Sequence, residues 1–289
     1  MRMQDKVAVV TGGASGIGRR TTERFVEEGG RVVIADRDEA SGLRLAAALG
    51  DAARFVRCDV VQEADVATAI GFAPSVWGRL DLVFCNAGAA GDPNPIETIS
   101  AEGWDATMHL LLRSVMLGIK HAVAVMKPQG YGAIVATASI AGVVPGSTPP
   151  AYAVAKAAVI HLTKCAAVEL APHRIRVNCI CPGAIATPIF SRRADLPSQT
   201  LDRVTEEIAG ALTGFQPIAR AGRPEDIAEA VLYLADDRAG FVTGVALPVD
   251  GGFAAGLTAQ QREALWRPVR MVVHEAAARG SAEPSTAAR

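Results

Sequence analysis

The sequence lacks an excess of charge of either sign. Its 29 Lys and Arg residues almost balance 30 Asp and Glu residues, the formal net charge is −1, and the cationic residues are spread along the chain. Proteins that bind nucleic acid carry a patch or stripe of positive charge that matches the phosphate backbone. The sequence therefore gives no indication of a DNA or RNA partner.

Long hydrophobic runs are also absent, although half of the 289 residues are hydrophobic. Apolar stretches such as 122–126 fall far short of the roughly 20 residues that a membrane-spanning helix needs. An expected strand follows Lys6, which leaves no room for a signal peptide before it. We therefore expect a soluble, cytoplasmic protein with no membrane partner.

Cysteine is scarce, and its spacing indicates neither a disulfide framework nor a zinc site. The count is odd, and no CxxC pair or neighbouring His ligand accompanies it. We expect most of the thiols to be small core residues. Two of them share one face of an expected strand, so a redox pair remains the alternative there. The five are Cys58, Cys85, Cys165 and the strand pair Cys179 and Cys181.

The sequence does contain a regular alternation of short β-rich runs and helical patterns. Parallel strands need crossover connections, and near-continuous apolar runs fit strands that are buried on both faces. The pattern predicts an α/β fold: a single-domain, Rossmann-type, doubly wound sheet of about seven parallel strands with helices on both faces. The expected strands are 7–10, 31–35, 53–58, 80–85, 133–137, 175–180 and 246–249, and the expected helices include 16–28, 63–76, 101–126, 152–171 and 224–235.

Two segments interrupt this alternation. Residues 184–223 combine prolines and glycines with apolar side chains, and long insertions of this kind often form lids or binding loops. We expect a substrate loop at about 188–215, with a surface helical hairpin as the alternative. Residues 1–253 would then form the nucleotide-binding and catalytic domain, and 254–289 a C-terminal extension that is partly helical and disordered from Gly280 onward.

A glycine-rich turn follows the first expected strand. The residues Thr11-Gly12-Gly13-Ala14-Ser15-Gly16-Ile17-Gly18 precede a helical pattern. Such glycines allow a sharp turn, admit a pyrophosphate close to the main chain and let the helix pack against the strand. The N-terminus of the helix then faces the anion, so the sequence predicts a bound nucleotide.

The end of the second expected strand bears on which dinucleotide is bound. Asp36 lies eighteen positions after Gly18, where a carboxylate accepts hydrogen bonds from the adenosine ribose and repels a 2′-phosphate. Arg37 favours the opposite choice, because a guanidinium pairs with phosphate, but the adjacent carboxylate opposes that pairing. We expect NAD rather than NADP, with a turn-capping acid as the alternative role of Asp36.

Polar residues that can carry a reaction follow later strands. Ser139 closes the fifth expected strand, and Tyr152 and Lys156 lie four residues apart on one face of a helix. An adjacent ammonium and a positively charged nicotinamide both favour the phenolate, so Tyr152 can serve as a general base. Lys156 can also hold the nicotinamide ribose, and Ser139 can orient the substrate oxygen.

Each of these residues also has an ordinary structural explanation. Tyr152 can be a core residue, Lys156 a solvated helix charge and Ser139 a turn residue. Their joint occurrence at the carboxyl ends of successive strands, where doubly wound sheets bind ligands, favours the catalytic interpretation.

Taken together, the motifs resemble the short-chain dehydrogenase/reductase family, in its branch of single-domain subunits, over about residues 5–253. The resemblance is carried by TGGASGIG at 11–18, CDV at 58–60, NAG at 86–88, Ser139, YAVAK at 152–156 and RVNCICPGAIATP at 176–188.

The resemblance implies further roles for residues of this chain. Asp59 and Val60 would contact the adenine, and Asn86, Ala87 and Gly88 would line the cofactor groove. It also implies a homotetramer in which helices 101–126 and 152–171 pack across a two-fold interface and the C-terminal strand makes another contact. The residues expected to hold the nicotinamide carboxamide are Pro182, Gly183, Ile185 and Thr187.

The sequence departs from the family pattern at one position. Members of the family place an asparagine on the helix before the fifth strand, and the matching residue here is Leu111. In the family, that asparagine positions a water near the lysine, and an alkyl side chain cannot do this. We expect a slower or rerouted proton relay. Nearby His109 is interpreted as a packing or surface residue.

The sequence thus predicts an NAD-dependent oxidoreductase that interconverts a secondary alcohol and a ketone, with Tyr152 as general acid and base. The apolar residues of the substrate loop favour a hydrophobic alcohol, alicyclic or aromatic, unless Arg192, Arg193 and Asp195 face the pocket. The alternative is a catalytically impaired NAD-binding scaffold or redox sensor.

Overall fold

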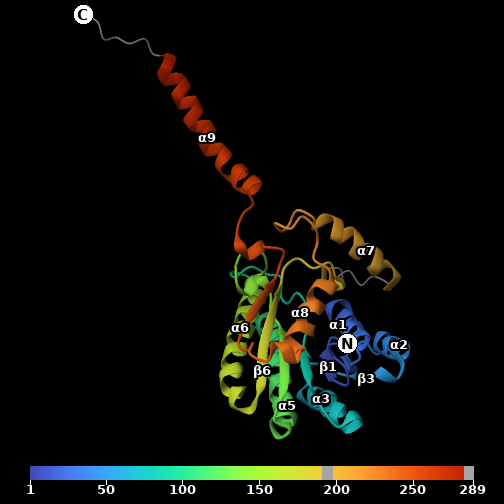
Figure 1. Cartoon of the computed structure of the whole chain (residues 1–289). Helices are drawn as coiled ribbons and strands as arrows, with labels where there is room; N and C mark the ends of the chain where they lie inside the picture. The colour runs from blue at the N-terminus through green and yellow to red at the C-terminus, as the bar shows by residue number, and fades with distance from the viewer. Residues whose placement is uncertain (191–197, 283–289) are drawn as a thin grey trace, which may run out of the picture. The chain divides into compact units, whose positions relative to one another are not determined.

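The computed structural model describes residues 1–190 and 198–282, and the chain divides into two compact units (Figure 1). The first unit, Met1–Ala254, holds the sheet and the helices around it. The second begins at Ala255 and contains one long helix, α9 (Ala259–Ala282). The expectation of disorder from Gly280 is wrong for Gly280–Ala282, which belong to α9, and residues 283–289 lie outside the described part.

The predicted doubly wound parallel sheet is confirmed. Its strands run in the order β3-β2-β1-β4-β5-β6-β7, and each neighbouring pair is parallel. The order reverses beside β1, so the carboxyl ends of β1 and β4 diverge and leave a crevice for a ligand. The bounds are β1 (Val7–Thr11), β2 (Arg31–Asp36), β3 (Ala53–Arg57), β4 (Leu82–Cys85), β5 (Gly132–Thr137), β6 (Ile175–Pro182) and β7 (Ala246–Val249).

Two hydrophobic cores cover the two faces of the sheet. Alternate residues of β1 show the division: Val7 and Val9 belong to one core, Ala8 and Val10 to the other. Residues of α3, α5 and α6 fill the first core, and residues of α1, α2 and α8 fill the second. The helices are α1 (Gly16–Glu27), α2 (Glu39–Leu49), α3 (Glu63–Trp77), α5 (Ser114–Gln129), α6 (Pro150–Leu170) and α8 (Pro224–Ala235).

The helix expected at 101–126 is longer and is interrupted. It consists of α4 (Ala101–Met108), a π-helical turn at His109–Arg113, and α5. A π turn adds one residue to the helical repeat and re-aims the side chains around it, and such turns are frequent at functional sites. The turn contains Leu111, whose side chain is buried.

Helix α2 was not among the expected helices. Asp38 caps its N-terminus by accepting a hydrogen bond from the Ser41 amide over 3.0 Å. Gly42 lies against the ring of Phe55 on β3, where an added Cβ would come within 2.2 Å of ring carbons. Glycine lowers helix propensity, so the residue that lets α2 pack on the sheet also weakens its sequence signal.

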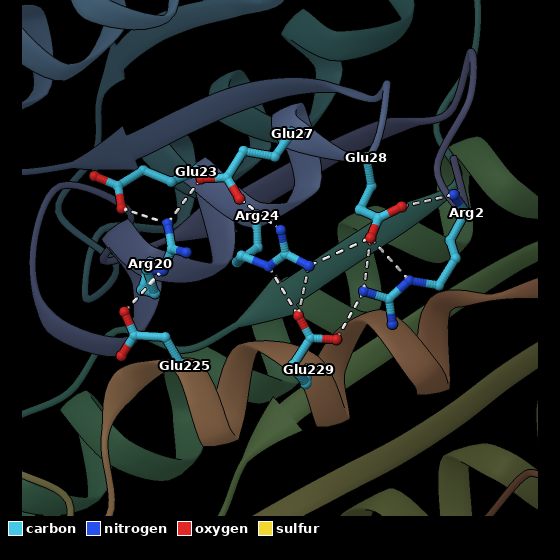
Figure 2. A network of polar contacts seen from close by, with 8 residues as sticks. All are labelled: Arg2, Arg20, Glu23, Arg24, Glu27, Glu28, Glu225 and Glu229. Atoms are coloured by element: carbon cyan, nitrogen blue, oxygen red, sulfur yellow. Dashed lines mark hydrogen bonds and ion pairs between the residues drawn. The ribbon is translucent and has the colours of Figure 1, made fainter.

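An ion-pair network joins α1 to α8 on the outside of the second core (Figure 2). Arg24 on α1 pairs with Glu27 on its own helix and with Glu229 on α8, at 2.5 and 2.7 Å. Arg2 pairs with Glu28 and Glu229 at 2.9 and 2.7 Å. The network ties α1 to α8 and to the N-terminal residues, so it helps to fix the helix that follows the glycine turn.

Two helical stretches, Ala101–Gln129 and Pro150–His173, are long and apolar enough to cross a membrane by length and composition alone. Both pack on the sheet: Val115 and Leu117 of α5 and Val159 of α6 belong to the first core. Core packing therefore accounts for part of their apolar character.

The segment expected to form the substrate loop is partly helical. A short 3₁₀ turn at Pro188–Phe190 begins it, and α7 (Ser198–Ala211) follows. Residues 191–197, with Arg192, Arg193 and Asp195, lie outside the described residues.

Candidate active site at the carboxyl edge of the sheet

The turn between β1 and α1 requires glycine for conformation and for space. Gly12 and Gly16 have φ angles of 63° and 52°. A Cβ on Gly12 would lie 2.9 Å from the Cα of Ala87, and a Cβ on Gly18 would lie 2.0 Å from the carbonyl oxygen of Gly12. The turn therefore packs main chain against main chain beside the end of β4.

The N-terminus of α1 borders the segment that follows β6. The N-cap residue Ser15 makes no side-chain capping hydrogen bond, and the first turn contains no acidic residue. A Cβ on Gly16 would lie only 3.5 Å from Thr187. Main-chain amides at the positive end of a helix dipole suit a pyrophosphate, so the residues present fit a bound dinucleotide.

Asp36 lies at the end of β2 with its carboxylate held in place. Only 6% of the residue is exposed, and its two oxygens accept hydrogen bonds from the amides of Ala14 and Asp38, each over 3.0 Å. Each carboxylate oxygen retains a further lone pair for a ribose hydroxyl. Arg37 is exposed.

Asp59 and Val60 follow β3 along the same edge. The Val61 amide donates to Asp59 Oδ1 over 3.2 Å, and the Asp59 amide donates to Asp65 Oδ2 over 2.9 Å. Val60 is 7% exposed. The Asp59 carboxylate thus shapes its own turn, and adenine contact by these two residues remains a prediction.

Asn86 connects the ends of three strands. Its amide nitrogen Nδ2 donates to the Thr11 carbonyl over 3.1 Å, and its Oδ1 accepts from the Thr137 hydroxyl over 3.2 Å. The Thr11 hydroxyl in turn accepts from the main-chain amides of Asn86 and Ala87. Asn86 therefore locks β1, β4 and β5 together at the edge where the ligand crevice opens.

Lys156 is buried behind Tyr152 on α6. Its residue is 4% exposed, and Nζ donates to the Thr137 carbonyl over 2.7 Å. Burial lowers the pKa of this amine from 10.5 to about 8. Nζ lies 5.7 Å from the centre of the Tyr152 ring, so the expected pairing of amine and phenol on one helix face is present in the structure.

Ser139 and Tyr152 lie near each other at the carboxyl edge of the sheet, as a shared substrate oxygen requires. Ser139 follows β5 in an extended conformation, and its hydroxyl accepts from the Ala141 amide over 3.2 Å. Burial raises the pKa of Tyr152 above its ordinary value of 10, and the hydrogen bond with Ser139 offsets part of the rise. Without a bound ligand, burial thus has a larger effect on the pKa of Tyr152 than the neighbouring groups that favour the phenolate.

The segment after β6 is fixed by main-chain contacts. A Cβ on Gly183 would lie 2.7 Å from the Cα of Asp250, so glycine is needed there. Ile185 forms an isolated parallel bridge with Gly222, and Thr187 is buried. These contacts place the residues expected to hold the carboxamide between the glycine turn and β7.

Leu111 is 1% exposed, and its Cδ2 lies 3.1 Å from where a Cβ on Gly88 would stand. The π turn therefore places an alkyl side chain beside Gly88 of the NAG motif. His109, two residues earlier, is exposed.

The cysteines are free thiols. Cys58, Cys85, Cys179 and Cys181 are buried and Cys165 is exposed. A contact with Cys181 lowers the pKa of Cys179, and the same contact, together with burial, raises that of Cys181. A redox role for the pair stays the alternative prediction.

Sequence reasoning missed two contributors to this edge of the sheet. Thr137 acts through its carbonyl oxygen, which every residue has, so no side-chain pattern marks it. Gln216 is a buried glutamine whose amide contacts Ala184. It stands alone in an irregular segment, and no periodicity points to it.

Comparison with known proteins gives consistent matches over the first unit. A family model described as enoyl-(acyl carrier protein) reductase matches residues 12–254. The chain is 41% identical to cis-4-hydroxycyclohexanecarboxylate dehydrogenase from Sinomonas cyclohexanicum. The match spans 254 residues, which are 87% of this chain and 97% of that protein. It is 39% identical to a mitochondrial borneol dehydrogenase from Lavandula x intermedia. That match spans 252 residues, which are 87% of this chain and 91% of that protein.

A crystal structure of levodione reductase is similar to this fold. The TM-score is 0.79 at 33% sequence identity, and the match covers 88% of this chain and 99% of that one. The family match and these relatives agree with the family resemblance that the motifs carry. The chain belongs to the short-chain dehydrogenase/reductase family of oxidoreductases.

Proposed function

We propose that this protein is an NAD-dependent dehydrogenase that interconverts a hydrophobic secondary alcohol on an alicyclic ring and its ketone. One observation carries the proposal. Ser139 and Tyr152 stand together at the carboxyl edge of the sheet, close enough for Ser139 to lower the pKa of Tyr152, and Lys156 Nζ lies 5.7 Å from the centre of the Tyr152 ring. A substrate oxygen placed between the two hydroxyls would exchange its proton with Tyr152.

The chain's own residues have separate tasks in this scheme. Ser139 orients the substrate oxygen, and Tyr152 accepts its proton in oxidation and returns it in reduction. Lys156 supplies positive charge that favours the phenolate, which is needed because burial alone raises the pKa of Tyr152. A bound nicotinamide dinucleotide would supply or accept the hydride.

The preference for NAD rests on Asp36. Its carboxylate is fixed by two main-chain amides at the end of β2, so it cannot easily swing away from a ligand. A 2′-phosphate brought against a fixed and partly desolvated carboxylate would meet strong repulsion, whereas two ribose hydroxyls would find an acceptor.

The substrate class rests on apolar side chains and on the relatives. Phe190 and Phe215, at the two ends of the segment expected to cover the substrate, are 53% and 42% exposed, and Phe215 stacks on Phe253 with ring centres 5.2 Å apart. Exposed apolar side chains at both ends favour a hydrophobic ligand beneath the segment. The names of two relatives, borneol dehydrogenase and cis-4-hydroxycyclohexanecarboxylate dehydrogenase, both specify ring alcohols.

We also propose a homotetramer in the cytoplasm, as the family resemblance implies. Met116 on α5 and Val154 and Val168 on α6 are exposed apolar residues on the two helices expected to pair across a two-fold axis. Sedimentation velocity of the purified protein tests the assembly.

The experiment is an activity screen with a site variant. The purified protein is incubated with NAD⁺ and a panel of cyclic and acyclic secondary alcohols, and the absorbance of the reduced cofactor is followed. We expect turnover of at least one ring alcohol and its loss in Tyr152→Phe. NAD⁺ binding without turnover across the panel would instead favour a nucleotide-bound scaffold or redox sensor, for which the buried Leu111 is the motivating observation.

A further inference from the structure

Gln216 is a buried side chain that binds main chain on both sides of its amide. The residue is 5% exposed. Its Oε1 accepts from the Ala184 amide over 3.1 Å, while Nε2 donates to the carbonyls of Ala184 and Arg220 over 3.4 and 2.9 Å. The side-chain amide thus contacts Ala184 at both its donor and its acceptor, much as a neighbouring strand would.

The contact falls within the segment after β6 that is expected to hold the nicotinamide. Ala184 lies between Gly183 and Ile185, and Gly183 could not carry a Cβ without bringing it within 3.0 Å of Gln216 Oε1. Gly222 adds two more main-chain bonds, donating to Ala184 over 3.0 Å and accepting from Ala186 over 2.9 Å. The segment is therefore held from one side by Gln216 and Gly222 together.

Gln216 is itself fixed by the chain that follows β7. The next residues pack there: the Ile218 amide donates to the Gly251 carbonyl over 2.9 Å, and a Cβ on Gly252 would lie 3.4 Å from the ring of Pro217. On the other side, Phe215 stacks on Phe253. Gln216, directly after the segment 188–215, thus binds Ala184, which lies four residues before that segment.

We propose that Gln216 is a positioning residue, which holds residues 182–187 in place for the nicotinamide end of the dinucleotide and joins that segment to the base of the substrate loop. The inference rests on the proposed function, because it needs the nicotinamide to lie against these residues. Gln216 acts through Ala184, so its loss should affect the nicotinamide half of the ligand and leave the adenosine half bound as before.

The chain offers a matched control in Gln129. Its Oε1 accepts from the Leu80 amide over 3.0 Å, and its Nε2 donates to the carbonyls of Leu80 and Tyr131 over 2.8 and 3.1 Å. This is the same set of contacts, but it lies at the amino edge of the sheet, before β4 and β5. A substitution there removes equivalent hydrogen bonds far from the expected ligand.

The experiment compares Gln216→Met with Gln129→Met. Methionine keeps the length of the side chain, whereas alanine would enlarge the adjacent cavity of about 330 Å³ that Gln216 and Ile185 help to line. For each protein we would measure the melting temperature, the affinities for NAD⁺ and for ADP-ribose, and the fluorescence of bound NADH. ADP-ribose lacks the nicotinamide, so it reports on the adenosine half alone.

We expect Gln216→Met to weaken NAD⁺ binding about tenfold, change ADP-ribose binding less than about twofold and reduce the fluorescence enhancement of NADH. Gln129→Met should lower the melting temperature without altering any of the three ligand signals. Should Gln216→Met fold poorly, Gln216→Asn keeps an uncharged amide with both donor and acceptor, one methylene shorter, and should give a smaller effect of the same pattern.

Equal weakening of NAD⁺ and ADP-ribose by Gln216→Met, or loss of NAD⁺ affinity in Gln129→Met, would overturn the inference while leaving the proposed function intact. A wild-type protein that binds ADP-ribose and NAD⁺ equally well, with no change in NADH fluorescence, would also overturn it. Failure of the wild type to bind either ligand would overturn the proposed function, and this inference with it.

Discussion

Lys156 Nζ donates a hydrogen bond to the main-chain carbonyl of Thr137 over 2.7 Å. The Thr137 hydroxyl donates to Asn86, whose amide donates to Thr11, so the amine on α6 is joined through three strand ends to the glycine turn. Lys156 is thus positioned by the sheet itself, and the burial that comes with this position also makes its positive charge unfavourable.

Lys156→Met should therefore stabilise the protein while abolishing turnover. The folded-state pKa of about 8 lies below the ordinary 10.5, so between these values the folded protein binds fewer protons than the unfolded chain, and wild-type stability rises with pH. We expect the variant to gain about 1–3 kcal/mol in free energy of unfolding at pH 7, less the loss of the Thr137 bond. This gain should shrink from pH 8 to 10.5.

Denaturant titration over this pH range measures the difference, with the exposed Lys164→Met on the same helix as the control. A variant that is less stable than wild type at pH 7 would show that the bond to Thr137 outweighs the cost of burying the charge.

Leu111→Asn should restore a polar group beside the NAG motif and raise kcat, with a changed pH profile. Because Leu111 is 1% exposed, the same substitution should lower the free energy of unfolding by about 2–4 kcal/mol. Leu117→Asn on α5, an equally buried leucine, should cost similar stability with no gain in rate. Steady-state kinetics against pH provide the test, and an unchanged rate and profile would mean that the relay does not limit turnover.

Asp36→Asn should relax the choice of dinucleotide. Removing the negative charge removes the repulsion of a 2′-phosphate, so NADP⁺ should bind at least about tenfold more tightly than to wild type, while NAD⁺ weakens. Adding Arg37→Met to this variant should reverse part of the gain, since the exposed guanidinium beside residue 36 in the sequence can pair with the phosphate. Fluorescence titration with both cofactors decides the matter, and tighter binding of NADP⁺ by the wild type would contradict the role given to Asp36.

Arg24→Met should weaken the attachment of α1 to α8 in a manner that depends on pH and salt. The hydrogen bond from Arg24 is the largest of the effects that lower the pKa of Glu27 on α1 below 4.5. Burial raises the pKa of Glu229 on α8, but hydrogen bonds from Arg2 and Arg24 outweigh burial and lower it below 4.5, so the stabilisation is present above that pH and is lost as pH falls below it. We expect a lower melting temperature at neutral pH, and a difference from wild type that vanishes in acid and narrows in high salt. Arg19→Met, which removes a single exposed pair with Glu23, should have less effect.

Much of the fold could be predicted because its signals are local. The apolar runs of β1 to β7 recur along the chain. The glycine turn has a spacing that the fold requires, because Gly12 and Gly16 have positive φ angles and Gly18 has no room for a Cβ. Tyr152 and Lys156 could be paired for the same reason, since residues four apart share a helix face.

Other features escaped prediction because neighbours in space create them. Helix α2 contains Gly42, which weakens its helical pattern but is required by the ring of Phe55 on another element. The π turn at His109–Arg113 leaves no sequence signature that distinguishes it from the helix on either side.

The sequence by itself determined the succession of strands along the chain, the glycine turn and the placement of Tyr152 and Lys156 on one helix face, because these depend on residue type and spacing. Only the tertiary structure decided that Lys156 binds the Thr137 carbonyl and that Gln216 binds both main-chain groups of Ala184. The physical reason is that the acceptors and donors involved belong to the main chain, which is alike at every residue, so only the fold selects which of them a buried side chain meets.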